Sequence, residues 1–172
     1  MRVIRTVAFA DVLETFRRER GDAGGSAPWT LRLLEQANAE LGPDWRDIEL
    51  TGLEAGAILL PRHAGEPCHG DRLTLVDDAG LTVAATALRF AGLEHDYRAA
   101  NRSCWGRIDR ARREPLSRIV VATAPLDHAE YRGLPRGAGL YHLDGLHRLI
   151  GWQLTGQLAD TAIVRAHMVG AL

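Results

Sequence analysis

The chain has 172 residues, of which 46% are hydrophobic, and a formal net charge of −1 at pH 7. This length and composition suffice for one domain with its own hydrophobic core. All 21 basic residues are arginine, which excludes a pyridoxal-phosphate Schiff base, a P-loop lysine and a lysine general base. The near-neutral net charge argues against nucleic-acid binding as the main role.

The sequence also bears on the location of the protein. No run of about 18 apolar residues is present, so no membrane span is expected. The N-terminus soon reaches Asp11 and Glu14 and lacks the apolar core of a signal peptide. The two cysteines, Cys68 and Cys104, are too few for a disulfide framework. We therefore predict a cytoplasmic protein with no membrane partner.

Residues 1–44 are predicted to form an N-terminal helical segment. A glycine-rich break at 21–26 separates two helices, and the second runs over 28–41 from Pro28 to the stop at Gly42-Pro43. The first helix carries apolar residues at helical spacing: Phe9, Val12, Leu13 and Phe16. We interpret both helices as core-forming scaffold, with a partner-binding face as the alternative.

From residue 45 to residue 90 the pattern is typical of strands. A short apolar run at 57–60 ends at Pro61, and residues 72–84 are predicted to form a β-hairpin around a turn that contains Gly80. The loop at 62–71 contains four side chains that can bind metals: His63, Cys68, His69 and Asp71. Because their spacing matches no paired metal motif, we predict a surface loop, with a zinc site as the alternative.

The segment 94–114 is polar and rich in arginine, and residues 101–106 interrupt any helical stripe. We predict a solvated connection. The alternative is a segment that folds over the functional site and lends an arginine to an anionic ligand through bidentate contacts. Cys104 is not predicted to be a nucleophile, because no histidine stands at a recognisable offset from it.

The most informative stretch is a predicted strand–turn–helix corner at 140–154. An alternating strand at 140–143 leads to Asp144-Gly145, and apolar residues then recur at helical spacing until Gly156. Buried strands are predicted on either side of it in the chain, at 119–122 and 162–169. The N–H groups and the dipole of the helix N-terminus favour an anion at the corner.

Three side chains of the corner have alternative interpretations. Asp144 could cap the following helix, bind a metal that bridges phosphate oxygens, or accept a proton from a substrate hydroxyl. Arg148 could bind phosphate or carboxylate, or form a structural ion pair. His147 could serve as a proton shuttle or a phosphate donor. His142, on the preceding strand, is predicted to be packed or hydrogen-bonded, with a metal pair with His147 as the alternative.

The corner resembles the Asp-Gly-His-His-Arg signature of the ParB/sulfiredoxin-like superfamily, in the version found in its free serine kinases. The resemblance covers residues 117–169, and Leu146 stands where the signature has its first histidine. In that branch a turn after a strand carries a catalytic glutamate, which Glu130 matches best, with Asp127 as the alternate. Only residues 131–139 separate this turn from the corner, where family members usually have a helix and a strand.

From these observations we predict an α+β fold with a small mixed β-sheet and packed helices. Residues 1–44 form the helical segment, and residues 45–172 form an α+β domain with the ParB/sulfiredoxin-like region at 117–169. The resemblance implies a small-molecule enzyme that transfers a phosphoryl group from ATP or ADP, with Mg²⁺, to an amino-acid-like metabolite. The implied site consists of Glu130 as base, Asp144 on Mg²⁺, and His147, Gly145 and Arg148 on the phosphates. The alternative is a non-catalytic anion-binding, nucleotide-binding or interaction protein.

Overall fold

The computed structural model describes residues 1–20, 27–63, 75–76, 80–137 and 139–171. This part of the chain contains a five-stranded mixed sheet and seven α-helices, which confirms the predicted α+β class. The elements in chain order are β1 (Arg2–Val7), α1 (Phe9–Arg20), α2 (Ala27–Leu41), β2 (Trp45–Thr51), α3 (Gly52–Gly56), α4 (Val83–Ala91), α5 (Glu94–Ala100), α6 (Arg102–Ala111), β3 (Ile119–Ala122), the 3-10 turn η1 (Ala129–Tyr131), β4 (Tyr141–Asp144), α7 (Leu146–Leu154) and β5 (Ile163–Val169).

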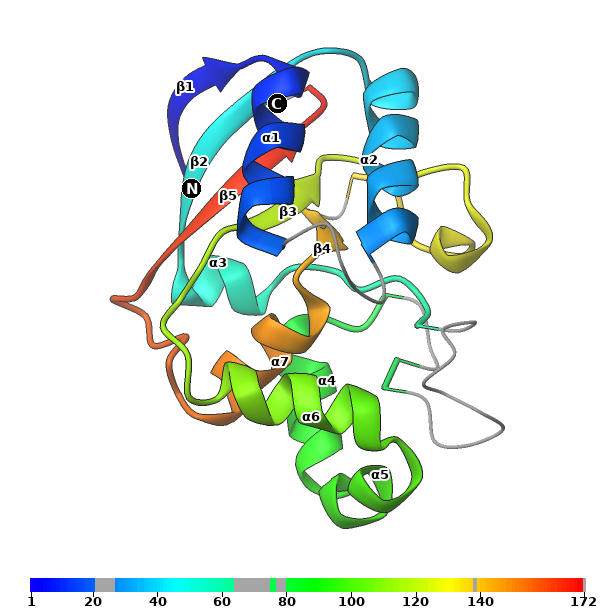
Figure 1. Ribbon diagram of the computed structural model, residues 1–172, viewed down its shortest axis with the longest axis vertical. Helices are drawn as coiled ribbons and strands as arrows, with labels where there is room; N and C mark the ends of the chain where they lie inside the picture. Colours follow the sequence, from blue (N-terminus) through cyan, green and yellow to red (C-terminus); the bar gives the residue numbers. More distant parts are fainter. Residues whose placement is uncertain (21–26, 64–74, 77–79, 138, 172) are drawn as a thin grey trace.

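The strands lie in the order β1-β2-β5-β3-β4 (Figure 1). The pairs β1/β2, β2/β5 and β3/β4 are antiparallel, whereas β3 and β5 are parallel. In the middle of the sheet, Asp47 of β2 lies opposite His167 of β5, and His167 lies opposite Val120 of β3. Because β1 pairs with β2, residues 1–44 contribute an edge strand to the sheet as well as two helices.

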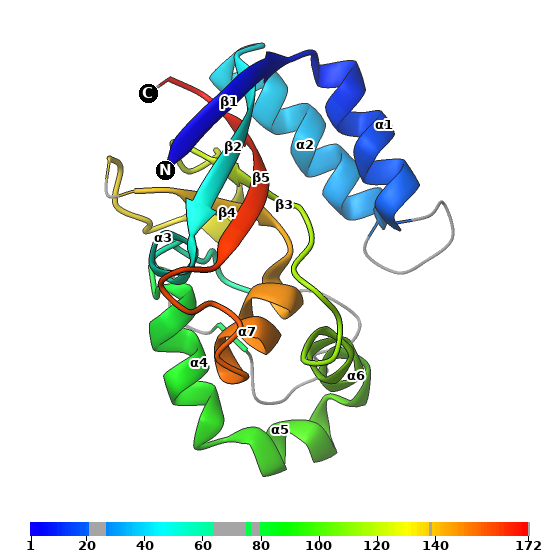
Figure 2. The same ribbon diagram turned by 90° about the vertical axis from the view of Figure 1, so that its left-hand side faces the viewer.

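The two faces of the sheet belong to two hydrophobic clusters, because alternate side chains of a strand point to opposite faces. One cluster packs α1 and α2 on one face and includes Phe16, Leu34 and Trp45. The other packs the helices α3 to α7 and includes Ile48 and Trp152. Figures 1 and 2 show α1 and α2 side by side, and α4 to α7 gathered at the opposite end of the molecule.

The helices and strands with the clearest sequence periodicity are confirmed. These are α1, α2, α7, β3, β4 and β5. The predicted stops are also confirmed: Gly42 after α2 and Gly156 after α7 have φ values of +86° and +73°. Such left-handed backbone is easy for glycine and ends a helix while satisfying its last carbonyl groups.

The prediction that residues 81–84 form the second strand of a hairpin over 72–84 is wrong. Thr82 is the N-cap of α4, and its hydroxyl accepts the backbone N–H of Ala85 at 3.1 Å. The helix that follows buries residues at helical spacing: Val83, Thr86, Ala87 and Phe90. A window of four residues is too short to distinguish this period from a strand. The first predicted strand lies largely outside the described residues.

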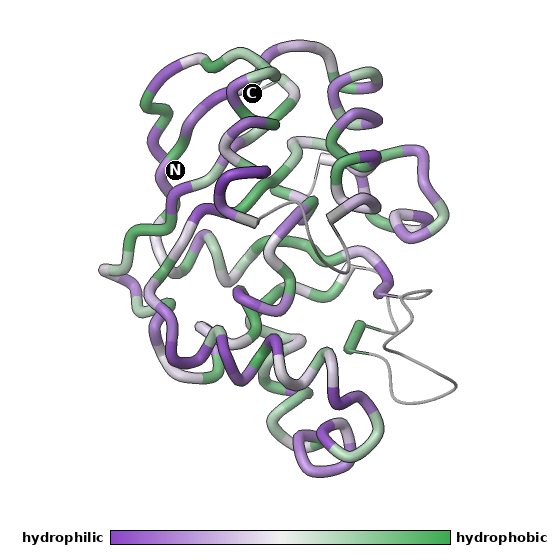
Figure 3. The backbone as a smooth tube through the Cα atoms, viewed as in Figure 1, coloured by the Kyte–Doolittle hydropathy of each residue, from purple (hydrophilic) through white to green (hydrophobic). Residues whose placement is uncertain are grey.

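The solvated connection predicted at 94–114 is also wrong, because α5 and α6 occupy most of it. Helix α6 buries Cys104, Ile108 and Ala111, which lie on one side at spacings of four and three residues. Hydrophilic and hydrophobic residues alternate along its tube in Figure 3. The arginines between the apolar positions are the solvent-facing side of an amphipathic helix.

Candidate functional site

A cavity of about 420 Å³ lies between the α1–α2 pair, helix α6 and the corner that joins β4 to α7. Its volume is in the range of small-molecule sites. All five site residues predicted from the sequence line it: Glu130, Asp144, Gly145, His147 and Arg148. Phe16 and Glu19 of α1 and Trp29 and Thr30 of α2 also line it. The two N-terminal helices, predicted as scaffold, thus form part of its wall.

The backbone of the corner requires glycine at position 145. Gly145 is the N-cap of α7 and has a φ of +107°, outside the region that L-residues favour. A Cβ atom at this position would lie 2.7 Å from Cγ2 of Ile119 on β3. The start of α7 therefore lies so close to β3 that a side chain at position 145 would not fit. The same turn places residues 142–148 along the cavity.

Asp144 and Arg148 form a mostly buried ion pair across the first turn of α7. Arg148 Nη2 lies 2.9 Å from Asp144 Oδ2, and the two side chains are 11% and 15% exposed. Arg148 Nη1 donates to Ser117 Oγ and to the carbonyl oxygen of Arg118, each at 2.6 Å. These bonds commit both terminal nitrogens of Arg148 to the protein, as the structural interpretation predicts.

The position of the N-cap corrects one interpretation of Asp144. Gly145 occupies the N-cap, so Asp144 lies one residue before it and does not cap the helix as an N-cap residue. The physical reason is the left-handed turn at Gly145, which places the Asp144 side chain against the guanidinium group one turn later. A role for Asp144 in metal binding or proton transfer stays a prediction.

The turn that carries Glu130 is tied to the corner by hydrogen bonds. The Tyr131 hydroxyl donates to the carbonyl oxygen of His142 on β4 at 2.7 Å. Burial raises the pKa of Tyr131 well above its ordinary value, and the nearby charge of Glu130 adds to the effect. The hydroxyl thus stays protonated and remains a donor. The carbonyl oxygen of Glu130 accepts the backbone N–H of Arg62 at 2.8 Å, which joins this turn to residues 62–63.

Helix α6 supplies the arginines on the other side of the cavity. Arg107 is half-buried and Arg110 is exposed, and both line the cavity together with Glu114 just beyond the helix. The alternative in which an arginine of segment 94–114 reaches the corner is therefore compatible with the observed geometry. Within the described part of the chain, the guanidinium group of Arg110 has no ion-pair partner.

Two histidines that line this cavity, His63 and His147, lie beside the buried Cys104. One ring nitrogen of each histidine and the sulfur of Cys104 lie within 4.8 Å of one another. The two imidazole rings are 5.3 Å apart between centroids and nearly perpendicular. The residues come from the segment after α3, from α6 and from α7, so no local spacing in the sequence could reveal the cluster. Of the side chains that the structure describes, these three form a group that could bind one metal ion.

Other predicted metal ligands do not belong to this cluster. His142 is buried in the wall of the same cavity, but it is not a member of the group that contains His147. Cys68, His69 and Asp71, which belong to the loop weighed as a zinc site, lie outside the described residues. His63, the one residue of these four that the structure describes, lies beside Cys104 and His147.

A model of the family described as "Family of unknown function (DUF6309)" matches residues 1–172, the whole chain. The chain belongs to this family. Comparisons with curated proteins and with solved structures gave no match. Membership of DUF6309 names no chemistry, so function has to be argued from the site. The ParB/sulfiredoxin-like resemblance of residues 117–169 stays a prediction.

Among the described residues, no helix is both long and apolar enough to cross a membrane. The longest, α2, has 15 residues, whereas a span takes roughly 20.

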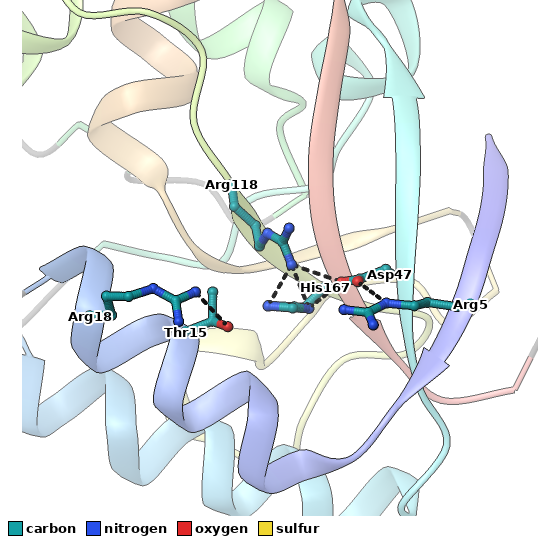
Figure 4. Close-up of polar contacts among 6 residues, drawn as sticks. All are labelled: Arg5, Thr15, Arg18, Asp47, Arg118 and His167. Atoms are coloured by element: carbon teal, nitrogen blue, oxygen red, sulfur yellow. Dashed lines mark hydrogen bonds and ion pairs between the residues drawn. The ribbon is translucent and has the colours of Figure 1, made fainter.

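A second polar cluster of the DUF6309 chain was not predicted from the sequence (Figure 4). Asp47 Oδ1 lies 2.8 Å from His167 Nδ1 and 2.8 Å from Arg118 Nη1, and Asp47 Oδ2 accepts from Arg5 Nε at 2.9 Å. Arg118 Nη1 is also 3.1 Å from His167 Nε2. Burial and the Arg118 charge lower the pKa of His167 to about 4. His167 is therefore neutral at pH 7, with Nδ1–H donating to Asp47, and Arg118 Nη1 lies against the ring, 3.5 Å from Nδ1 as well as close to Nε2.

We expect His167 to make the folded state sensitive to acid. Its folded pKa of about 4 is below the ordinary 6.5, so the unfolded chain binds more protons between these values. The free energy of unfolding should be unaffected by His167 above pH 6.5 and should fall by about 3 kcal/mol as the pH drops to 4. Urea denaturation of the wild type and of His167→Asn over this range measures the effect. Equal pH dependence of the two proteins would contradict it.

Proposed function

We propose that this DUF6309 protein is an enzyme that acts on a small zwitterionic, amino-acid-like metabolite and transfers a phosphoryl group from a nucleotide to its hydroxyl group. One observation carries the proposal. Glu130, Asp144 and His147 converge on one cavity, opposite the arginines of α6. A carboxylate base, a cation for phosphate and a carboxylate for Mg²⁺ are what phosphoryl transfer requires.

The charges of the cavity support a ligand that carries both signs. Its wall holds the guanidinium groups of Arg107 and Arg110, together with the carboxylates of Glu19, Glu114 and Glu130. Arg148 and Asp144 add no net charge, because they pair with each other. An ammonium group beside Glu19 and a carboxylate or phosphate beside Arg110 would each meet the opposite charge.

The geometry changes which arginine we assign to the anionic group. Both terminal nitrogens of Arg148 are committed to Asp144, Ser117 and the Arg118 carbonyl. The exposed guanidinium of Arg110 lines the same cavity, and no ion pair is shown for it within the described residues. We therefore assign the contact with a phosphate or carboxylate to Arg110. Arg148 stabilises the corner through its bonds to Asp144, Ser117 and Arg118.

Glu130 is assigned as the general base that accepts the proton of the substrate hydroxyl. It is half-buried at the cavity wall, and the bond from Arg62 to its carbonyl oxygen fixes its backbone. Carboxylate oxygens suit Mg²⁺, so Asp144 fits the metal-binding role implied by the resemblance to free serine kinases. Mg²⁺ bound there would neutralise phosphate charge, and its binding would compete with Arg148 for the same carboxylate.

Glu130→Gln should separate turnover from binding. The amide keeps the shape of the side chain but cannot accept the proton, so we expect kcat to fall by about 10²–10⁴-fold with substrate affinity nearly unchanged. Nucleoside diphosphate release from ATP, with hydroxyl-bearing amino acids as acceptors, measures turnover, and calorimetry measures affinity. Glu35→Gln, at an exposed position of α2 that does not line the cavity, is the matched control and should stay active. Full activity in Glu130→Gln would overturn the assignment of the base.

The second candidate function is a non-catalytic anion-binding or nucleotide-binding protein. It is favoured by the Asp144–Arg148 pair, which gives the most conspicuous charged residues of the corner a structural role. Under this alternative Arg110→Ala would weaken ligand binding, whereas Glu130→Gln would change nothing that can be measured. Binding of a nucleotide without any turnover across the acceptor panel would select this alternative.

A further inference from the structure

We propose that His63, Cys104 and His147 bind a zinc ion beside the cavity. This inference goes beyond the proposed function, because it does not depend on which reaction the cavity performs. It concerns three side chains that phosphoryl transfer does not require as a group. It also gives His147 a role different from the proton shuttle suggested by its place in the sequence.

The distances between the three side chains suit zinc. Their ligand atoms lie within 4.8 Å of one another. Tetrahedral zinc has bonds of about 2.0–2.1 Å to histidine nitrogen and about 2.3 Å to cysteine sulfur, which separates its ligands by roughly 3.3–3.6 Å. The observed separations therefore exceed those of a tetrahedral site by at most roughly 1.5 Å. Two imidazoles and a thiolate are also the ligand types that zinc prefers over oxygen-only sets.

The backbone positions that hold the cluster are fixed by close packing. A Cβ atom on Gly151 of α7 would lie 2.8 Å from the carbonyl oxygen of Ile108 on α6, so the two helices are in close contact at these positions. Cys104 and His147 each lie one turn before these contact residues. The third ligand is held from another segment, because His63 donates its backbone N–H to the carbonyl oxygen of Val76 at 3.1 Å.

The burial of the ligands indicates how the ion would be oriented. Cys104 has no exposed surface, whereas His63 and His147 line the cavity. A zinc ion held by the three would therefore have its thiolate on the protein side and its fourth position on the cavity side. Three protein ligands with one open position are typical of zinc sites that bind water or substrate, whereas structural sites are closed by four. Because the described residues offer no fourth side chain to this group, water or an oxygen atom of the ligand in the cavity can complete the coordination.

The test uses the Cys68→Ser variant of the full chain, stripped of metal with a chelator and titrated with Co²⁺. The chain has two cysteines, so Cys104 is then the sole thiol. We expect one equivalent of Co²⁺ to produce a thiolate-to-cobalt charge-transfer band and the strong visible bands of four-coordinate cobalt. One equivalent of Zn²⁺ should remove both. Neither nucleotide nor substrate is present, so failure of the kinase proposal cannot imitate failure of this one.

Two ligand variants complete the test. Adding Cys104→Ser or His147→Gln should weaken zinc binding by about 100-fold or more, because even the loss of an outer partner of a metal ligand costs 10–100-fold. Circular dichroism confirms that each variant is folded. If both fail to fold, the cobalt spectrum of the Cys68→Ser chain decides alone. Absence of the charge-transfer band, or its persistence after Cys104→Ser, would overturn the proposal.

Discussion

Arg148→Ala should lower the free energy of unfolding by about 2–4 kcal/mol. The substitution removes the partner of a carboxylate that is only 15% exposed, and it deletes two further bonds at 2.6 Å to Ser117 Oγ and the Arg118 carbonyl. Removal of one partner of a buried ion pair is strongly destabilising, because the charge of the other partner stays buried without compensation. Urea denaturation at neutral pH measures the loss.

A double-mutant cycle with Asp144→Asn isolates the ion pair from the other bonds of Arg148. We expect the two residues to show a coupling energy of about 1–3 kcal/mol, since they are in direct contact. Asp144→Asn alone leaves the bonds from Arg148 to Ser117 and Arg118 in place, so it should cost less than Arg148→Ala. Additive effects of the two substitutions would mean that solvent screens the pair and that Arg148 acts through its other bonds.

Gly145→Ala should destabilise the fold by about 3 kcal/mol and loosen the corner. Two costs combine in this estimate. A non-glycine residue is strained at a φ of +107°, and the new Cβ would meet Cγ2 of Ile119 at 2.7 Å and Nη2 of Arg148 at 3.1 Å. Relief of the overlap requires α7 to move away from β3 and the Arg148 guanidinium to shift. Thermal and urea denaturation of the variant measure the cost.

Gly156→Ala is the matched control for the backbone cost alone. Gly156 also has a positive φ, +73°, but a Cβ there meets nothing within 4 Å. We expect this variant to lose about 1 kcal/mol, the usual cost of left-handed backbone in a residue with a side chain. The difference between the two variants is then the cost of overlap with Ile119 and Arg148. Equal losses would show that the corner can relax without strain.

The sequence predicted those parts of the fold in which local pattern and tertiary environment agree. Helix α7 has apolar residues at a 3.6-residue period between two glycines, and strand β3 is a short apolar run, so both were predicted correctly. Helix α4 begins at a threonine cap in an alternating stretch, where local pattern favours a strand. Helix α3 is too short to show a helical period in its sequence, but it begins with the capping box Thr51–Glu54, which is recognisable in the sequence.

The candidate site was predictable only where its residues are close together in the sequence. The corner from Asp144 to Arg148 was identified because strand, glycine turn and helix follow one another in the chain. The partners of this corner come from elsewhere: Cys104 and Arg110 from α6, and His63 from the segment after α3. Periodicity describes single elements and carries no information on which elements pack together. The absence of a histidine near Cys104 in sequence therefore gave no indication of its neighbours in space.

The Asp47–His167 cluster shows the same limit within the sheet. Asp47 lies on β2 and His167 on β5, and only the register of the two strands places them opposite each other. Register depends on the whole hydrophobic pattern of both strands and on their neighbours, and neither strand sequence specifies it alone. The low pKa of His167 follows from that register and from Arg118, which approaches from the segment before β3.

A thermal-shift titration tests most directly whether the cavity beside the corner binds a nucleotide together with Mg²⁺, as we propose. The melting temperature of the wild type is measured with ATP, ADP and CTP, each with and without Mg²⁺. The Arg110→Ala variant is measured under the same conditions. A ligand that binds only the folded state raises Tm by mass action. Arg110 is exposed, so its removal should leave the melting of the free protein unchanged.

We expect a Mg²⁺-dependent rise in Tm with at least one nucleotide in the wild type, and we expect this rise to be lost in Arg110→Ala. Arg148→Ala is unsuitable for this comparison, because the loss of its ion pair with Asp144 lowers Tm by itself. No shift with any nucleotide, in a protein that melts cooperatively, would contradict the proposed phosphoryl transfer.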